Sequence, residues 1–216
     1  MGLPAFRAAM FDMDGTLLRT MRYWRLTTLE FLLSMGIYPT EAELSRVFVT
    51  SSRKLCQEIL AGRGIEMSRE EILAGLEGYM HRHYLNDATA KPRVGEYLER
   101  LQAQGIPMCV GTAAPRAFAA DGLKRLGLDH YFEFIADGYQ YGVNKTSPEF
   151  FYLMAEKLGV ETKDMCVFED ALYSIRSAKE AGCSVIGIED YTQHHDREEI
   201  IRLSDFYIRE YAELLD

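Results

Sequence analysis

Short apolar runs recur along the chain and alternate with longer segments in which apolar residues follow helical spacing. The runs predict strands at residues 6–11, 107–111, 133–136, 165–168, 184–188 and 206–208. The longer segments predict helices at residues 93–104, 116–126, 147–158 and 171–181. Ser147 followed by Pro148 is typical of a helix start. Strands that alternate with helices indicate parallel pairing, so we predict an α/β fold with a Rossmann-like, doubly wound parallel sheet.

Residues 17–91 break this alternation, because no segment there has a convincing strand pattern. Helical spacing instead predicts four helices, at about 20–35, 40–49, 52–61 and 68–84. The second and the fourth begin with the capping-box pattern, Thr40 with Glu43 and Ser68 with Glu71. We therefore expect a core domain made of residues 1–16 and 92–216, and an all-helical domain, residues 17–91, inserted after the first strand.

The composition narrows the class of protein. Of the 216 residues, 48% are apolar and 26% are charged, as in an ordinary globular protein. The formal net charge of −9 argues against binding to nucleic acid or to an anionic membrane. No apolar stretch approaches the roughly 20 residues of a membrane span, and the N-terminus lacks a signal-peptide pattern. Cys109 and Cys166 lie inside apolar runs, which indicates buried free thiols, so we expect a cytoplasmic protein of unassigned oligomeric state.

Polar side chains follow four of the predicted strands, in the loops where those strands end. In chain order they are Asp12 and Asp14, Thr112, Lys145, and Glu169 and Asp170. In an open parallel sheet, ligands bind beyond the carboxyl ends of the strands. We therefore expect these side chains to meet in one crevice at that edge.

The four carboxylates of this crevice would repel one another, and Lys145 supplies only one compensating charge. A divalent cation would supply two more, and carboxylate and carbonyl oxygens suit Mg²⁺ better than Zn²⁺. A hydroxyl and a lysine beside Mg²⁺ favour a phosphate site. In that setting Asp12 would attack phosphorus to form an aspartyl-phosphate, and Asp14 would transfer protons.

These motifs, in this order, resemble the haloacid dehalogenase-like superfamily of phosphotransferases. "DMDGT" is similar to the first motif of that family, "MCVGT" to the second, "NKTSPEFF" to the third and "VFEDALYSIRSAKEAG" to the fourth. The resemblance covers essentially the whole chain, and the predicted helical insertion matches the small helical cap of the family. The most similar patterns are those of β-phosphoglucomutase-like and phosphoglycolate phosphatase-like members.

The resemblance implies a role for each motif residue. Asp12 would be the nucleophile and a Mg²⁺ ligand, and Asp14 would be the general acid and base and a ligand through its backbone carbonyl. Thr112, the adjacent Ala113 and Lys145 would bind the phosphoryl group. Glu169 and Asp170 would hold the metal or its water. The implied function is a Mg²⁺-dependent phosphatase of a small phosphomonoester, with a sugar phosphate as one candidate.

Some positions depart from the family's pattern. Thr146, Ala171 and Ser174 replace the usual Pro, Ser and Gly of the third and fourth motifs, and none of these changes removes a reacting group. The chain also lacks residues that related mutases use around a second phosphate. Candidate substrate contacts are instead Arg19, Arg22, Trp24 and Arg116.

Two alternatives remain open at this point. A phosphosugar mutase would use the same residues but retain its phosphoenzyme, and the missing mutase residues argue against it. A non-catalytic binding protein on this fold is disfavoured because Asp12, Asp14, Lys145 and Asp170 are all present. A calcium loop built on the same aspartates fails, because Met10 and Met21 would occupy ligand positions.

Overall fold

The computed structural model describes residues 3–48 and 50–215 of the chain. The chain divides into two compact units, one made of Met1–Arg19 and Thr89–Asp216 and the other of Thr20–Ala88. We call them the core unit and the helical unit, and each is described by itself.

The core unit contains a six-stranded sheet in which neighbouring strands pair in parallel throughout the described residues. The strands are β1 (Ala8–Phe11), β2 (Met108–Thr112), β3 (Phe134–Asp137), β4 (Met165–Glu169), β5 (Ser184–Ile188) and β6 (Phe206–Ile208), in the spatial order β3-β2-β1-β4-β5-β6. The order reverses at β1, which lies between β2 and β4. The predicted α/β class with a doubly wound parallel sheet is therefore confirmed.

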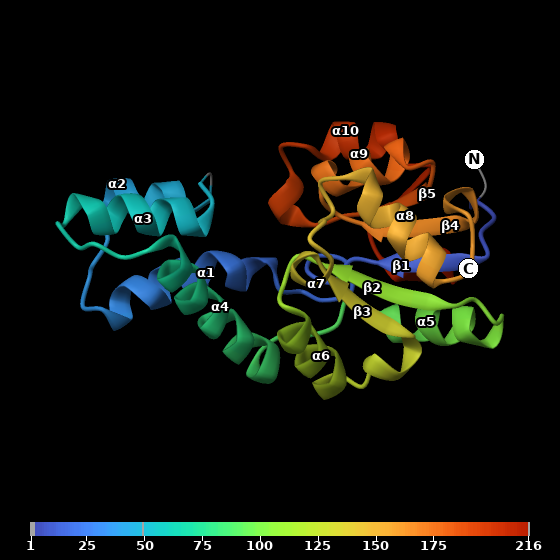
Figure 1. The fold of residues 1–216 in the computed structure, drawn as a ribbon, viewed down its shortest axis with the longest axis horizontal. Coiled ribbons are helices and arrows are strands. Elements are labelled where there is room, and N and C mark those ends of the chain that lie inside the picture. Colours follow the sequence, from blue (N-terminus) through green and yellow to red (C-terminus); the bar gives the residue numbers. More distant parts are fainter. Residues whose placement is uncertain (1–2, 49, 216) are drawn as a thin grey trace. The chain divides into compact units, whose positions relative to one another are not determined.

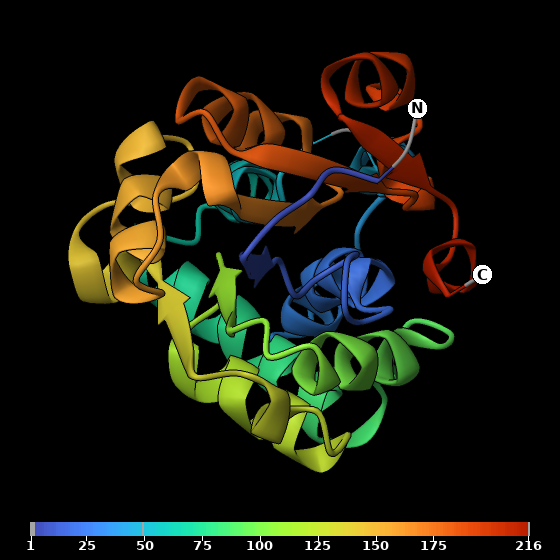
Figure 2. The ribbon, with the colours of Figure 1, turned by 90° about the vertical axis from the view of Figure 1, so that its right-hand side faces the viewer.

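Helices cover both faces of this sheet. One face carries α5 (Val94–Ala103) and α6 (Arg116–Arg125), and the other carries α8 (Pro148–Lys157), α9 (Leu172–Glu180) and α10 (Arg197–Leu203), as Figures 1 and 2 show. Right-handed crossovers explain this division, because the chain adds strands on one side of β1 and then on the other.

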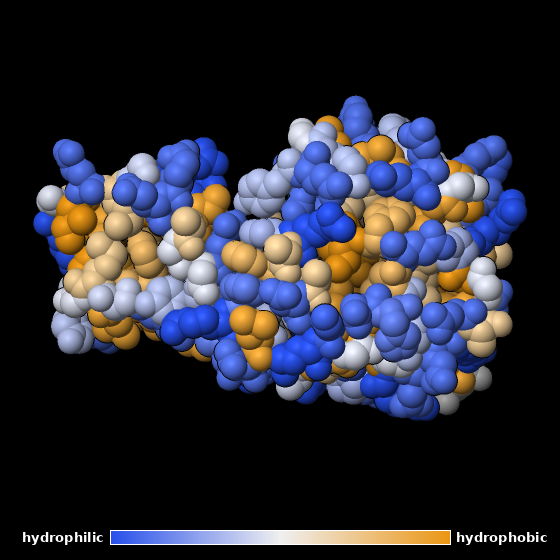
Figure 3. Space-filling model, turned by 60° about the horizontal axis from the view of Figure 1, so that its bottom comes forward, coloured by the Kyte–Doolittle hydropathy of each residue, from blue (hydrophilic) through white to orange (hydrophobic). Residues whose placement is uncertain are grey.

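The core lies between the sheet and its helices. Met10 on β1, Phe150 and Met154 on α8 and Ile175 on α9 are fully buried in one cluster. Gly111 on β2 has no side chain because a Cβ there would lie 2.7 Å from Met10 Cε and 3.0 Å from Phe150 Cε1. On the outside, in the view of Figure 3, hydrophilic surface surrounds smaller hydrophobic areas of the core unit.

The helical unit consists of α1 (Met21–Ser34), α2 (Glu41–Leu44), the 3₁₀ helix η1 (Ser45–Phe48), α3 (Ser52–Gly62) and α4 (Arg69–Asn86). Both predicted capping boxes form, with Thr40 and Ser68 accepting from the backbone of Glu43 and Glu71. The helix predicted at 40–49 is instead split between α2 and η1, and its last residue, Val49, lies outside the described residues.

The chain crosses between the units twice, and the two crossing segments are hydrogen-bonded neighbours. The amide of Arg19 donates to the carbonyl of Thr89 at 2.8 Å, and the amide of Lys91 donates to the carbonyl of Leu17 at 2.8 Å. Leu18 and Ala90 form an antiparallel bridge between them. This pairing joins the two segments of the core unit that lead into and out of the helical unit.

Three details differ from the sequence predictions. Ser147 precedes α8, but its hydroxyl contacts Glu149 instead of capping the helix backbone. Short α7 (Gly138–Tyr141) and α10 carry no strong periodic pattern and were not predicted.

The free cysteines Cys109 and Cys166 are buried, as predicted. None of the helices in the described ranges has both the length and the apolar character of a membrane span.

Candidate active site

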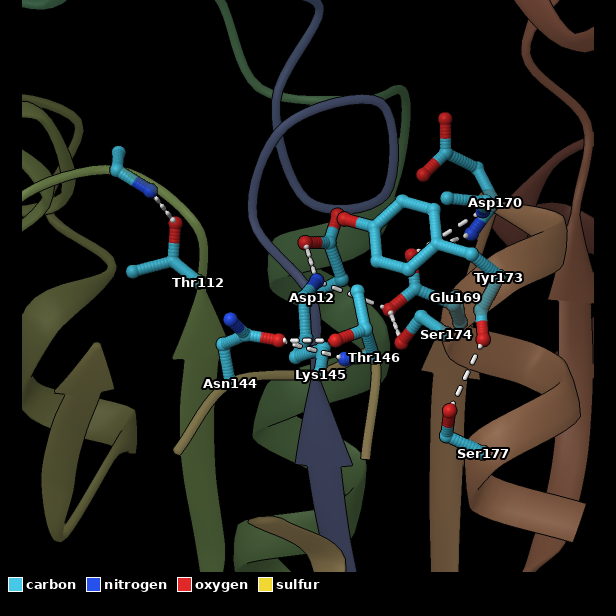
Figure 4. Close-up of polar contacts among 12 residues, drawn as sticks. Asp12, Thr112, Asn144, Lys145, Thr146, Glu169, Asp170, Tyr173, Ser174 and Ser177 are labelled. Carbon is cyan, nitrogen blue, oxygen red and sulfur yellow. Dashed lines mark hydrogen bonds and ion pairs between the residues drawn. The ribbon is translucent and has the colours of Figure 1, made fainter. Parts of the chain in front are cut away.

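The polar residues predicted to meet at the sheet edge do come from the ends of adjacent strands. Asp12 follows β1, Thr112 ends β2 and Glu169 ends β4 (Figure 4). After Asp12 the chain turns sharply: the amides of Leu17 and Leu18 both donate to the carbonyl of Met13, and Gly15 has a φ of 95°. A left-handed conformation of this kind favours glycine, which explains the Gly of the DMDGT motif.

Lys145 lies at the centre of the polar cluster. Its ammonium group contacts Asp12 Oδ1 and lies 3.0 Å from Glu169 Oε2. All three side chains are buried, with exposed fractions of 6% or less. With both carboxylates ionised, the three groups carry one net negative charge, which a bound cation would neutralise.

Glu169 has partners at both of its carboxylate oxygens. Its Oε1 accepts from the amides of Asp170 and Ala171, at 3.2 and 3.1 Å. Its Oε2 accepts from Lys145 and from the hydroxyl of Ser174, at 3.0 and 2.6 Å. Four donors therefore hold this carboxylate in a fixed orientation.

Asp12 and Asp170 differ from Glu169, because each keeps a carboxylate oxygen without a partner. Asp12 Oδ2 and Asp170 Oδ2 are buried and accept no hydrogen bond in the part of the chain that the structure describes. One oxygen each of Asp12, Glu169 and Asp170 lies within 4.8 Å of the others. Buried oxygens of this kind are costly unless a cation holds them, so the residues fit a divalent metal with oxygen ligands.

The electrostatics agree with that fit. Burial raises the pKa of Asp12 to about 8, with Glu169 and Asp14 adding to the effect against Lys145. Burial, together with Asp12 and Glu169, likewise raises the pKa of Asp170 well above its usual range. Burial disfavours the charged form of Lys145, but Asp12 and Glu169 outweigh it and raise the pKa of the ammonium group. The protein alone thus holds its lysine charged while opposing the ionisation of two aspartates.

A pocket adjoins this cluster on the β2 side. It has a volume of about 360 Å³ and is lined by Thr112, Ala113, Gly138, Tyr139, Asn144, Lys145, Thr146 and Tyr173. The three residues predicted to bind phosphate therefore line one cavity. The hydroxyl oxygen of Thr112 accepts from the amide of Ala114 at 3.0 Å, which leaves its own proton available for donation to a ligand.

The four predicted substrate contacts are not among the residues that line this pocket. The side chain of Arg116 is exposed, and its backbone amide donates to Asp137 Oδ2 at 2.6 Å. Arg19 is also exposed. Arg22 and Trp24 belong to the helical unit, where Arg22 lies over the Tyr23 ring and the Trp24 carbonyl accepts from Ser52. A substrate contact by any of them stays a prediction.

Sequence reasoning missed three residues of the site. Ser174, interpreted above as a departure from a family pattern, donates to Glu169. Asp137 ends β3 and accepts from the amides of Arg116 and Gln140, at 2.6 and 2.8 Å, so it ties α6 to α7. Tyr173 extends from the start of α9 toward Asp12 (Figure 4). The position of Asp137 at the carboxyl end of β3 was the available signal, because polar residues also lie at the ends of β1, β2 and β4.

Comparisons with known proteins place this geometry in context. A family model described as haloacid dehalogenase-like hydrolase matches residues 9–188. A phosphoglycolate phosphatase from Pectobacterium atrosepticum is 27% identical over 99% of this chain and 92% of that protein. A phosphorylated carbohydrates phosphatase from Thermotoga maritima is 29% identical over 81% of each chain. A phosphoglycolate phosphatase from Neisseria meningitidis is 32% identical over 84% of this chain and 80% of that protein.

Solved structures show the same fold. A predicted phosphoglycolate phosphatase from Haemophilus somnus has a TM-score of 0.78 at 22% identity and covers 99% of this chain and 98% of its own. A structure described as a putative β-phosphoglucomutase from Thermotoga maritima has a TM-score of 0.75 at 25% identity, with 94% of each chain covered.

Proposed function

Because the chain belongs to the haloacid dehalogenase-like hydrolases, we propose that it is a Mg²⁺-dependent phosphatase that works through an aspartyl-phosphate on Asp12. The family predicted from the motifs is confirmed, and so is its class of activity, a phosphatase of small phosphorylated molecules. The single observation that carries the finer proposal is the buried cluster in which Lys145 contacts Asp12 and Glu169 beside a pocket lined by Thr112.

The first half-reaction transfers the phosphoryl group to the enzyme. A carboxylate oxygen of Asp12 attacks phosphorus, and the bond between phosphorus and the ester oxygen breaks. Asp14 donates a proton to the departing oxygen, so that the product leaves as an alcohol. Lys145 and Thr112 bind the non-bridging oxygens, where negative charge must be held during transfer.

The second half-reaction releases phosphate. Asp14, now ionised, takes a proton from a water molecule, and the water oxygen attacks phosphorus. The bond between phosphorus and Asp12 breaks, which restores the Asp12 carboxylate and frees inorganic phosphate. The same residue thus serves first as the acid and then as the base.

Enzymes of this family generally use a divalent metal, and we assign Mg²⁺ because the donors are all oxygens. Asp12 and Asp170 would hold it through the carboxylate oxygens that lack partners, with the carbonyl of Asp14 as a further ligand. Glu169 would act one step away, since its oxygens already accept from four donors. When bound, the ion neutralises charge on the phosphoryl oxygens and keeps the aspartates ionised.

The helical unit, Thr20–Ala88, would act as the cap of the active site. The predicted bounds, 1–16 and 92–216 for the catalytic core and 17–91 for the cap domain, stay a prediction. A closed cap would exclude bulk water while the aspartyl-phosphate forms. A cytoplasmic location suits the buried free cysteines, and the net charge of −9 suits a small-molecule substrate better than nucleic acid.

Phosphate release from a panel of phosphomonoesters tests this proposal. The wild type should turn over at least one ester with Mg²⁺ and none after chelation, and Asp12→Asn should lose about 10³-fold or more of that activity. Asp129→Asn, an exposed aspartate outside the site, is the matched control and should stay active. Intact activity in Asp12→Asn would refute the proposal. Transfer of phosphate between positions of a hexose, without release, would identify a mutase instead.

A further inference from the structure

The pocket beside the phosphate-binding residues has walls that none of the sequence motifs explain. Two aromatic side chains line it, Tyr139 on α7 and Tyr173 at the start of α9. Both residues are only partly buried, with exposed fractions of 63% and 45%. In a folded core of this size, large aromatic residues are usually more buried, so two partly exposed tyrosines on one pocket suggest a binding role.

The position of Tyr139 is built into the fold. Asp137 at the end of β3 accepts from the amide of Gln140 at 2.8 Å and so starts α7 directly after the strand. Gly138 lets α7 approach the loop that carries Lys145, because a Cβ there would lie 2.8 Å from Asn144 Cβ. Tyr139 is thereby held at the same edge as the phosphate-binding residues.

The phenol of Tyr173 lies within the field of the catalytic cluster. The charge of Lys145 lowers the pKa of Tyr173, but burial and the carboxylates of Glu169, Asp12 and Asp170 outweigh it and raise the pKa to about 12. The side chain therefore stays neutral and offers a flat ring with a hydroxyl donor at its tip.

The rest of the pocket wall is polar but uncharged. The amide oxygen of Asn144 accepts from the backbone and the hydroxyl of Thr146, at 2.9 and 2.5 Å, so its amino group is the end left for a ligand. Among the lining residues, within the described part of the chain, Lys145 is the only cation, and two carboxylates already contact it. A second anionic group on a substrate would find no counter-charge here.

From these walls we infer that Tyr139 and Tyr173 determine specificity: they select phosphomonoesters whose leaving group is an uncharged ring, against short esters that carry a carboxylate. This inference rests on the proposed phosphatase function and names the substrate class for it. A sugar ring or an aryl ring would lay its apolar face on a tyrosine ring, while its hydroxyl groups or edge face Asn144. The carboxylate of 2-phosphoglycolate would instead be desolvated against aromatic surface.

The test compares kcat/KM for three esters: glucose 6-phosphate, p-nitrophenyl phosphate and 2-phosphoglycolate. The wild type should favour the ring-bearing esters, and the preferred one tells a sugar from an aryl group. Tyr173→Ala and Tyr139→Ala should each lower kcat/KM for that ester by roughly two- to tenfold more than they lower it for 2-phosphoglycolate. Tyr173→Phe, which keeps the ring, should retain most of the preference. Tyr152→Ala, at a half-exposed tyrosine on α8, is the matched control and should leave kcat/KM unchanged for all three esters.

Two results would overturn the inference while leaving the phosphatase intact. One is a wild type that prefers 2-phosphoglycolate, and the other is an equal loss on all three esters in the Ala variants. If the wild type hydrolyses no ester, the proposed function fails, and binding then tests the inference separately. Calorimetry on Asp12→Asn should show tighter binding of the ring-bearing ester than of 2-phosphoglycolate, and equal or reversed affinities would refute the role of the tyrosines.

Discussion

Both units of the chain place a basic side chain between two carboxylates, but in very different surroundings. In the core unit, Lys145 contacts Asp12 and Glu169, and all three side chains are buried. In the helical unit, His83 Nδ1 lies 2.7 Å from Asp87 and Nε2 lies 2.8 Å from Glu30. There the imidazole is 12% exposed, and the carboxylates of Glu30 and Asp87 are 35% and 50% exposed.

The difference in burial separates a cluster that suits the proposed active site from one that serves packing. Water solvates Glu30 and Asp87, so the histidine cluster needs no further charge, and the Tyr23 ring stacked 4.4 Å from the imidazole completes a packing contact between α1 and α4. Water does not reach the lysine cluster, where Asp12 and Asp170 keep oxygens without partners. A buried site with too little positive charge lowers the stability of the folded protein, and it favours the binding of a cation, as binding sites do.

The largest effect should come from removing the buried ammonium group. Lys145→Met leaves Asp12 and Glu169 facing each other without a counter-charge and takes a donor from the phosphoryl group, so kcat should fall by about 10³-fold. Steady-state phosphate release measures this change. Lys124→Met, an exposed lysine on α6, is the control, and near-normal turnover by Lys145→Met would show that the cluster has no catalytic part.

Metal addition should stabilise the core unit even without substrate. At a concentration of about 100 times its Kd, Mg²⁺ should add about 2.7 kcal/mol to the free energy of unfolding, seen as a rise of several degrees in Tm. Asp170→Asn removes one of the oxygens without a partner, so the rise should shrink or vanish. An unchanged rise in Asp170→Asn would mean that the ion binds elsewhere on the protein.

The next effect should come from the hydroxyl that orients Glu169. Ser174→Ala removes a hydrogen bond of 2.6 Å to a buried carboxylate, which should lower the free energy of unfolding by about 2 kcal/mol. Chemical denaturation measures it. Ser177→Ala, one turn further along α9, removes a longer hydrogen bond of 3.2 Å to a backbone carbonyl. It should lower the free energy of unfolding by less than Ser174→Ala does. Equal costs for the two variants would remove the special role of Ser174.

The histidine cluster of the helical unit should lose less stability than the lysine cluster when its basic side chain is removed. His83→Gln removes the contacts that the two ring nitrogens make with Asp87 and Glu30. Because the carboxylates are solvated, the loss in the free energy of unfolding should be about 1 kcal/mol. His195→Gln, an exposed histidine of the core unit, serves as the control. A loss as large as that of Ser174→Ala would contradict the comparison drawn from burial.

The smallest effect concerns acid stability in the helical unit. The hydrogen bonds from Arg63 and from the backbone of Thr40 lower the pKa of Glu43 to about 2. The folded state therefore favours the carboxylate, and its stabilisation is fully present above about pH 4.5 and is lost as the pH falls toward 2. The free energy of unfolding of Glu43→Gln should thus be lower than that of the wild type by less than about 1 kcal/mol near pH 7, and the difference should shrink as the pH falls. Unfolding curves between pH 2 and pH 7 measure it, and a constant gap would contradict it.

The sequence predicted those features that depend on local pattern. Apolar runs located the strands to within one or two residues, and the carboxylates after β1 and β4 lie at the sheet edge because parallel strands end there together. The capping boxes at Thr40 and Ser68 formed because their contacts span only three residues. The domain boundaries and the roles of Arg22 and Trp24 stay predictions.

Features set by tertiary contact could not be predicted in the same way. The hydroxyl of Ser174 and the ring of Tyr173 acquire meaning only because α9 starts beside the cluster formed by Asp12 and Lys145. Ser147 fits the pattern of an N-cap, yet its hydroxyl contacts Glu149 instead, because two acceptors compete for one donor. The short α7 has no periodicity to detect, since it depends on the contact of Asp137 with Gln140.

The paired crossings at Leu17–Arg19 and Thr89–Lys91 have a consequence for how such a protein can change. The chain leaves the core unit and returns to it at one place, because the amide of Arg19 donates to the carbonyl of Thr89 on either side of residues 20–88. Replacing this segment with a tight turn should therefore leave the strand pairings of the core sheet in place. The helical unit would then be a part of the protein that can change independently of the sheet edge where Asp12 lies.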